Sequence, residues 1–347
     1  MNNSTHYLLL LYLREELIHA TITSLVGLFG FIFNIVVCIV IFTNKSLQKQ
    51  PLNHFIASLA LSDLLMACAI GPAYMFRFIA IIDHERFKDF PISASTAICQ
   101  IKIFVIGLSL SITGLTLAMI SVERRRAILY PFSLPMSKRK VFIILAAIWL
   151  ISGVTGYLLA SVHGFLPQFP FVCQLTSKSF QFNAIVAVIF SFFSNLFPLP
   201  IMIVCYANII MELGRKSLLR NQVYQQYSTL KIIKKKYKSI VALLLITLLT
   251  ATSSSPFIIT YVFISYRQLM DYRYTYKVHS STFWKYFQAA SIAMLVPCSL
   301  NPILYNFASS TFQQEIKAIP KKLRCNCYSN LRTRKNSSGK YILPTLI

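Results

Sequence analysis

The chain has 347 residues, 56% of them hydrophobic and only 13% charged, and it carries a net charge of +24. So apolar a composition excludes an ordinary soluble domain of this length and favours a protein whose solvent is the lipid bilayer. In a soluble protein the positive charge would suggest nucleic-acid binding. Here the basic residues lie between long apolar runs, so no nucleic-acid partner is expected.

Seven apolar segments are long enough to cross a bilayer, because a membrane helix needs about 20 predominantly apolar residues. Each segment is predicted to be helical, since lipid cannot satisfy free backbone polar groups. In chain order they are 18–43, 53–79, 98–127, 140–162, 181–211, 238–264 and 283–307. We therefore expect an all-α seven-transmembrane bundle over 18–307, an N-terminal segment 1–17 and a basic tail 308–347.

The segments that connect seven spans fall into two groups on opposite sides of the membrane. One group carries 24 of the 34 lysines and arginines, at 45–49, 124–140, 215–238 and 317–340. The positive-inside rule places this group in the cytoplasm and the N-terminus outside, as in a multi-pass plasma-membrane protein. The basic segments are expected to contact anionic inner-leaflet lipid. Asn2 and Asn3 begin overlapping sequons that we expect to be glycosylated.

Asp63 lies within the second span, where a carboxylate at the helix centre costs at least a few kcal/mol, so it is expected to face the bundle interior. Its predicted partners are Asn34 in the first span and Asn301 in the seventh, because amides hydrogen-bond buried carboxylates. Pro198, Pro256 and Pro302 stand where later spans could kink. These residues predict a polar seam and hinges inside the bundle.

Taken in order, these residues resemble the rhodopsin-like family of G-protein-coupled receptors. The matches are GFIFN ending at Asn34, LALSD ending at Asp63, Cys99 opening the third span, ERR at Glu123, Arg124 and Arg125, Trp149 in the fourth span, Pro198 with Tyr206 in the fifth, Pro256 in the sixth, and NPILY from Asn301 through Pro302 to Tyr305. Phe312 suits the short amphipathic eighth helix of that family. The resemblance extends over nearly the whole chain.

The resemblance implies a disulfide between Cys99 and Cys173, the cysteine available in the second extracellular loop. It also implies a switch in which Arg124 leaves its pairing with Glu123 to contact a partner, Tyr206 and Tyr305. An extracellular ligand would favour the arrangement that opens to a heterotrimeric G protein, with arrestin as a further partner.

Palmitoylation of Cys325 and Cys327, in the basic stretch beyond the eighth helix, would suit this family. Free cytoplasmic thiols are an equal alternative for these two cysteines.

The sixth span departs from the family pattern. Ser254 stands where the family usually has a tryptophan, Thr250 where it has a phenylalanine, and Lys236 where an acidic residue often pairs with the third-span arginine. The lost packing and the like charges predict a weaker inactive state and raised basal signalling.

A sodium ion at Asp63 remains an alternative, because Asp63, Thr113 and Asn301 keep part of the family's cation pocket. It is disfavoured because Ser254 and Pro297 replace the usual tryptophan and asparagine.

The resemblance also limits the ligand. Ile106 replaces the aspartate of monoamine receptors and Leu295 the lysine that holds retinal, so neither ligand is expected. Lys102 and Arg77 could meet an acidic ligand or a peptide carboxylate, although solvated charge is the simpler interpretation of most basic loop residues.

Two alternatives come from other classes. A scavenging or accessory receptor that does not signal would explain the altered sixth span, whereas the intact Arg124, Tyr206 and Tyr305 argue against it. A transporter is disfavoured because the sequence shows no internal repeats. No enzyme or cofactor is expected, since phosphate-binding glycine loops, HExxH, GxSxG and Cys/His metal clusters are all missing from the sequence.

Overall fold

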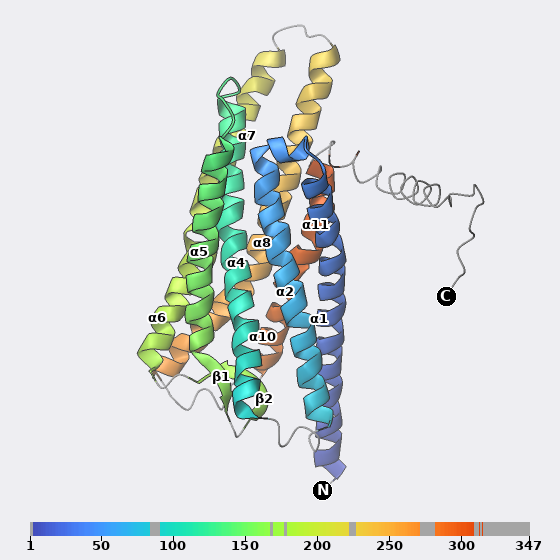
Figure 1. Cartoon of the computed structure of the whole chain (residues 1–347), viewed down its shortest axis with the longest axis vertical. Coiled ribbons are helices and arrows are strands. Elements are labelled where there is room, and N and C mark those ends of the chain that lie inside the picture. Colours follow the sequence, from blue (N-terminus) through green and yellow to red (C-terminus); the bar gives the residue numbers. More distant parts are fainter. Residues whose placement is uncertain are drawn as a thin grey trace, which may run out of the picture.

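The computed structural model describes residues 3–83, 91–166, 169–176, 179–221, 227–270, 282–308, 312 and 314. Long helices lie side by side along the longest axis of the molecule (Figure 1). They are α1 (Asn3–Thr43), α2 (Pro51–Ile82), α4 (Ile92–Leu129), α5 (Lys138–Ser161), α6 (Phe180–Ser191), α7 (Pro198–Asn221), α8 (Tyr227–Met270), α10 (Thr282–Ala293) and α11 (Val296–Ala308), with a 3-10 turn η1 at Leu47–Lys49. The fold is the predicted seven-transmembrane bundle.

The helices close into a ring in chain order. α1 packs against α2 and α11, α2 against α4, α4 against α5 and α7, and α8 against α6, α10 and α11. α4 is the central helix, because 83% of its most apolar window is buried, against 28% for α5. Residues on α4 therefore contact most of the bundle, whereas α5 is peripheral.

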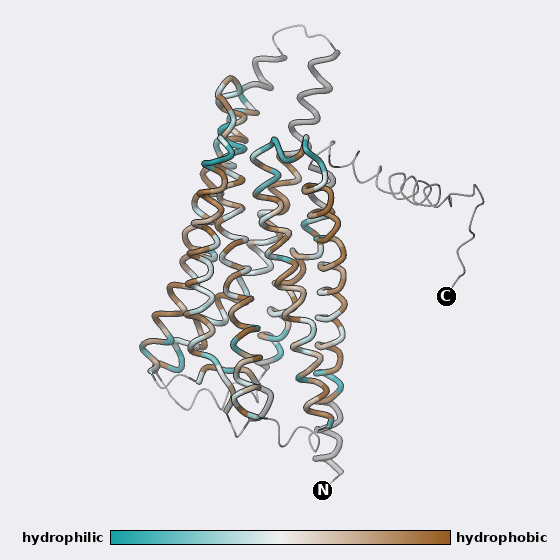
Figure 2. Tube along the Cα trace, in the orientation of Figure 1, coloured by the Kyte–Doolittle hydropathy of each residue, from teal (hydrophilic) through white to brown (hydrophobic). Residues whose placement is uncertain are grey.

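The outer surface of the bundle is apolar. Large hydrophobic side chains such as Leu150, Tyr157 and Ile203 are exposed on the helices, an arrangement that water would oppose and lipid tails satisfy. Hydrophobic residues run along the middle of the helices, and hydrophilic residues gather toward both ends (Figure 2). Within the described part of the chain, six helical segments are long and apolar enough to span a membrane, and the seventh crossing is divided between α10 and α11.

Two features differ from the sequence prediction. The first helix starts at Asn3 and not near residue 18, so the charged run at Arg14, Glu15 and Glu16 lies on α1 itself. The fold is also not purely α-helical, because β1 (His163–Leu166) and β2 (Phe169–Leu175) form an antiparallel hairpin after α5. Hydropathy could not show either feature. The start of α1 precedes the first apolar run, and the hairpin lies between the fourth and the fifth.

The fifth crossing contains a π-helical turn, η2 (Phe192–Leu196), between α6 and α7. The Phe197 N–H donates to the Phe192 carbonyl at 2.9 Å, and Pro198 has no N–H to offer the Ser194 carbonyl. That carbonyl lies against Gly114 of α4, where any Cβ would overlap it. Pro198 was predicted to kink the span. The structure shows a π-helical turn before Pro198, and the carbonyl that this turn exposes packs against Gly114.

A pair of glycines, Gly107 and Gly156, sets the contact between α4 and α5. A Cβ on Gly107 would lie 2.9 Å from the Cα of Gly156, and a Cβ on Gly156 would lie 2.8 Å from the Phe104 carbonyl oxygen. Small residues allow membrane helices to approach this closely. Gly153, three residues earlier on α5, has open space around it.

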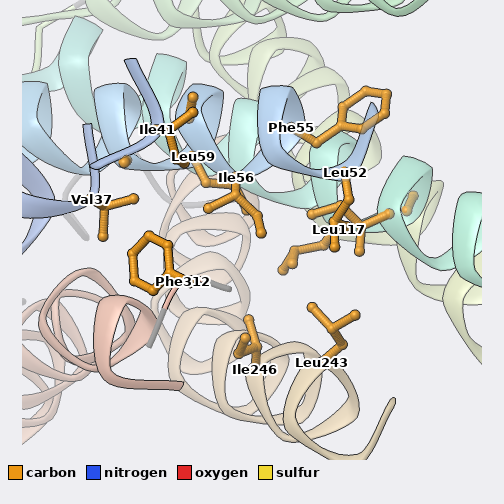
Figure 3. Packing of buried hydrophobic residues seen from close by; sticks show 14 of the residues in the cluster. Val37, Ile41, Leu52, Phe55, Ile56, Leu59, Leu117, Leu243, Ile246 and Phe312 are labelled. Atoms are coloured by element: carbon orange, nitrogen blue, oxygen red, sulfur yellow. The ribbon is translucent and has the colours of Figure 1, made fainter. Parts of the chain in front are cut away.

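The largest apolar cluster joins α1, α2, α4, α7 and α8 at the end of the bundle that carries Glu123 and Arg124, here called the arginine end. Phe312, from beyond α11, is 3% exposed and lies in this cluster. Figure 3 shows its ring facing Val37, Ile56 and Ile246. The segment after α11 is thus anchored on the core at this residue, as an amphipathic eighth helix requires.

Candidate functional site

The opposite end of the bundle, where β1, β2 and the start of α1 lie, is here called the hairpin end. Cys99 of α4 and Cys173 of β2 form the expected disulfide, with their Cα atoms 5.5 Å apart. The bond holds β2 against the first turns of α4. The hairpin is therefore fixed across this end of the bundle.

A cavity opens at the hairpin end, with an empty volume of about 660 Å³ that includes open solvent. Its wall comes from α2, α4, α5, the hairpin, α8 and α10, so nearly the whole ring contributes. The wall includes the Phe257 and Phe287 rings, whose centroids are 5.4 Å apart, and the floor includes Ile106. A concave, mostly apolar pocket with a few convergent polar groups is the usual form of a ligand site.

A buried ion pair closes one side of the cavity. The Glu16 Oε1 of α1 accepts a hydrogen bond from Arg77 Nη2 of α2 at 3.0 Å and one from Gln288 Nε2 of α10 at 2.8 Å. Both charged side chains are at most 10% exposed. His19 Nε2, one turn along α1, donates to the Gln288 carbonyl at 3.2 Å. These contacts tie α1 to α2 and α10.

The neighbouring Glu15 offers a contrast to Glu16. Its carboxylate pairs with Lys285 Nζ at 2.6 Å, but both side chains are about half exposed. An exposed pair of this kind contributes about 0–1 kcal/mol, whereas a buried pair is sensitive to loss of either partner.

Lys102 of α4 also lines the cavity. Its Nζ lies 5.1 Å from the centroid of the Tyr74 ring, in cation–π geometry. Burial and, to a smaller extent, the charge of Lys102 lower the pKa of His163 to about 4, although its hydrogen bond to Leu159 acts in the opposite direction. His163 is therefore neutral at pH 7, and its Nδ1 donates to the Leu159 carbonyl at 2.7 Å.

The polar seam runs through the middle of the bundle. Asp63 is 2% exposed and its Oδ2 accepts from Asn301 Nδ2 at 3.4 Å. The Asn34 amide does not reach Asp63, contrary to the sequence prediction: it donates to the Gly30 carbonyl at 2.8 Å and to the Cys298 carbonyl at 2.7 Å. Asn34 therefore fastens α1 to the backbone of α11, while Asp63 links α2 to α11.

The fourth span joins this centre through Trp149, whose Nε1 donates to Ser58 Oγ of α2 at 2.9 Å. Within the described residues, no group of three or more His, Cys, Asp or Glu side chains is placed to hold a metal ion. The expected sodium site combines Asp63 with the Thr113 hydroxyl and the Asn301 amide, which are not ligands of those four types, so sodium binding at Asp63 stays a prediction.

A narrow space lies beneath the ligand cavity, with room for no more than about one water molecule. Thr250 and Ser254, which stand where the family has two aromatic rings, both line it, together with Gly114 and the π-helical Ser194. Ser254 Oγ donates to the Thr250 carbonyl at 2.7 Å, but the buried Thr250 Oγ1 finds no partner in the described part of the protein. Thr250 and Ser254 therefore place small polar side chains, and not aromatic rings, at a centre that has little free space.

The arginine end holds the predicted coupling residues. Arg124 Nε lies 2.8 Å from Glu123 Oε2, close enough for an ion pair but not aligned for a hydrogen bond. The Tyr206 hydroxyl of α7 is within 3.1 Å of Thr247 Oγ1 of α8, and the Arg124 charge lies nearby. Tyr206 therefore links the fifth and sixth crossings and does not contact Arg124 through a hydrogen bond.

Several predicted site residues lie outside the described residues or have only their backbone described. Asn2, Cys325 and Cys327 are outside the described residues, and Asn3, Lys236 and Tyr305 are placed in helices without described side chains. Pro256 and Pro302 lie inside α8 and α11. Glu16 and His163 could not be assigned a role from the sequence, because nothing in their local pattern signals their distant partners.

A family model described as "7 transmembrane receptor (rhodopsin family)" matches residues 33–305 of the chain. The chain is 25% identical to neuromedin-U receptor 2 of Rattus norvegicus over 335 residues, covering 93% of this chain and 80% of that protein. It is 25% identical to the pyroglutamylated RF-amide peptide receptor of Mus musculus, covering 92% and 72%. It is also 25% identical to the tachykinin-like peptides receptor 86C of Drosophila melanogaster, covering 87% and 60%.

Proposed function

Since the chain belongs to the seven-transmembrane receptors of the rhodopsin family, we propose that its extracellular ligand is a peptide, bound in the cavity at the hairpin end. Two of the relatives are named for peptide ligands. The cavity supports the proposal, because it opens to solvent and joins apolar, aromatic and charged groups in one wall. The protein is a multi-pass membrane receptor that passes a ligand signal to heterotrimeric G proteins.

The orientation belongs to this proposal. The hairpin end faces the outside of the plasma membrane with 1–17 and its sequons at Asn2 and Asn3, and the basic tail 308–347 lies in the cytoplasm. Its support is the concentration of lysine and arginine in the segments that lead to the arginine end. The disulfide agrees with this placement, since such bonds persist in oxidising compartments.

The proposed mechanism is a two-state shift. A ligand moves the equilibrium only as far as it binds one state better than the other, and its contacts here span α2, α4, α8 and α10. A change in the spacing of these helices shifts α2 relative to α11 at the Asp63–Asn301 hydrogen bond. The shift then alters the Tyr206–Thr247 contact between α7 and α8 at the arginine end. Arg124, freed from Glu123, then meets the G protein, with Tyr305 and arrestin in the roles that the family suggests.

We also propose raised basal signalling. The observation that supports it is the presence of two small side chains, Thr250 and Ser254, where α8 faces α4 and α7 and where the family has aromatic rings. Smaller side chains make fewer van der Waals contacts, so less packing energy opposes a rearrangement of α8.

The test is nucleotide exchange on a panel of purified G proteins added to membranes that contain the native receptor. We expect exchange above that of receptor-free membranes without any ligand, and its loss in Arg124→Ala. Arg14→Ala, which removes an exposed cation from the hairpin end, should exchange like the native chain at equal surface expression.

Identical exchange in the native chain and in Arg124→Ala across the whole panel would contradict signalling through the arginine end. That result would favour a scavenging receptor. Arg124-dependent exchange that appears only with added peptide would retain the receptor and reject the raised basal activity.

A further inference from the structure

The two cations in the wall of the ligand cavity are not equivalent. Arg77 has a carboxylate of the protein itself, Glu16, at 3.0 Å. Lys102 faces the Tyr74 ring, and in the part of the chain that the structure describes no carboxylate pairs with it. The cavity wall therefore contains one balanced charge and one ammonium without a counterion.

The histidine of the wall does not offset the charge of Lys102. His163 is neutral at pH 7, and because its Nδ1 donates to the Leu159 carbonyl, its Nε2 is left as an acceptor. The aromatic face of Tyr74 attracts a cation but carries no net negative charge, so it does not neutralise the ammonium as an aligned carboxylate would. The site is electrostatically incomplete around Lys102.

We propose that the cavity binds a carboxylate of the ligand, with Lys102 Nζ as its anchor, the Tyr74 ring beside the ammonium and the Phe257–Phe287 pair beside the adjoining apolar part. This inference rests on the proposed peptide ligand and adds its chemical class. The carboxylate can be the free C-terminus of the peptide or an acidic side chain. A peptide without either would leave the Lys102 charge uncompensated in a partly dehydrated site, which opposes binding.

Arg77 is the weaker anchor. Its guanidinium already has Glu16, and Glu16 in turn accepts from Gln288, so a ligand carboxylate would have to displace a buried contact that joins three helices. Lys102 needs no such displacement. The difference between the two cations therefore orients the ligand with its acidic group toward α4.

The experiment uses the full-length receptor, purified and immobilised, and three pools of synthetic octapeptides. The first pool has free C-terminal carboxylates and no Asp or Glu. The second has the same sequences with C-terminal amides, and the third has amide termini and one Asp or Glu. Captured peptides are counted by mass spectrometry. We expect the first or the third pool to be enriched about tenfold over the second, the size of one charge-assisted contact.

Lys102→Gln should abolish this preference, Lys102→Arg should retain it, and Lys285→Gln, which removes an exposed cation paired with Glu15, should leave it unchanged. Equal or greater capture of the second pool by the native receptor would overturn the anionic ligand while leaving a peptide receptor in place. A preference that persists in Lys102→Gln would overturn the anchor. Capture of none of the pools would contradict both proposals.

Discussion

Both ends of the bundle contain a buried apolar cluster, but they differ in the polar contacts that cross between segments. At the hairpin end, a buried ion pair, a disulfide and side-chain hydrogen bonds cross between helices around a cavity. At the arginine end, the helices meet through the largest apolar cluster, and the ion pair of Glu123 and Arg124 joins neighbours in sequence. Polar contacts can be exchanged for those of a ligand, whereas apolar packing yields only when helices separate. A ligand can therefore replace contacts at the hairpin end, whereas the arginine end changes only when helices move apart.

Loss of Glu16 should produce the largest effect on this contrast. Glu16→Gln removes the negative charge from the buried pair with Arg77, and breaking a buried pair in this way costs about 3 kcal/mol or more. Glu15→Gln is the matched control, because its partner Lys285 is exposed, and it should change stability by less than about 1 kcal/mol. Thermal unfolding of both variants in detergent measures the difference. Equal losses would show that burial does not distinguish the two pairs.

A side chain at Gly156 should disturb both ends together, since α4 contacts most of the ring. Gly156→Val places carbon atoms where the Phe104 carbonyl and the α4 backbone already lie, and overpacking of this kind costs about 2 kcal/mol. We expect lower thermal stability and lower surface expression. Gly153→Val, on the same helix with open space around it, should match the native chain. A Gly153 variant as damaged as Gly156→Val would mean that helix propensity, and not the α4 contact, is responsible.

Acid should weaken the hairpin end selectively. The pKa of His163 falls from its ordinary 6.5 to about 4 in the folded protein, so the unfolded chain takes up the proton first. The stabilisation is complete above pH 6.5 and is lost as the pH falls toward 4, by roughly 2 kcal/mol at pH 5. The melting temperature of the native receptor should therefore approach that of His163→Asn between pH 7 and pH 5. A constant gap between the two proteins would refute the buried neutral histidine.

The smallest effect is expected at the arginine end. Tyr206→Phe keeps the ring in the apolar cluster and removes only the hydroxyl that meets Thr247, at a cost of about 1 kcal/mol. Because that contact joins α7 to α8, basal nucleotide exchange should change more than stability does. Tyr157→Phe, on the lipid-facing side of α5, should alter neither quantity. Unchanged exchange in Tyr206→Phe would assign the coupling to apolar packing alone.

The local features of the chain were readable without coordinates. Apolar runs of about 20 residues must be membrane helices, and Asp63, Cys99 and Asn301 stand at spacings that the family resemblance interprets, so the bundle and the Cys99–Cys173 disulfide followed. The start of the first helix was predicted too late, since its polar residues read as a loop whereas the helix begins at Asn3. The two strands of the hairpin have only 4 and 7 residues, which is too short for an alternating pattern to be recognised beside the long apolar runs.

Contacts between distant segments needed the folded chain. Glu16 meets Arg77, and among the described residues no carboxylate pairs with Lys102. Asn34 donates to the Cys298 carbonyl, and Gly114 lies against the Ser194 carbonyl. Hydropathy and motifs specify which stretches enter the membrane, because lipid selects them one helix at a time. The partner of each buried polar group depends on how every helix is rotated about its axis and on the depth at which it sits, and those quantities are fixed only when all seven crossings pack together.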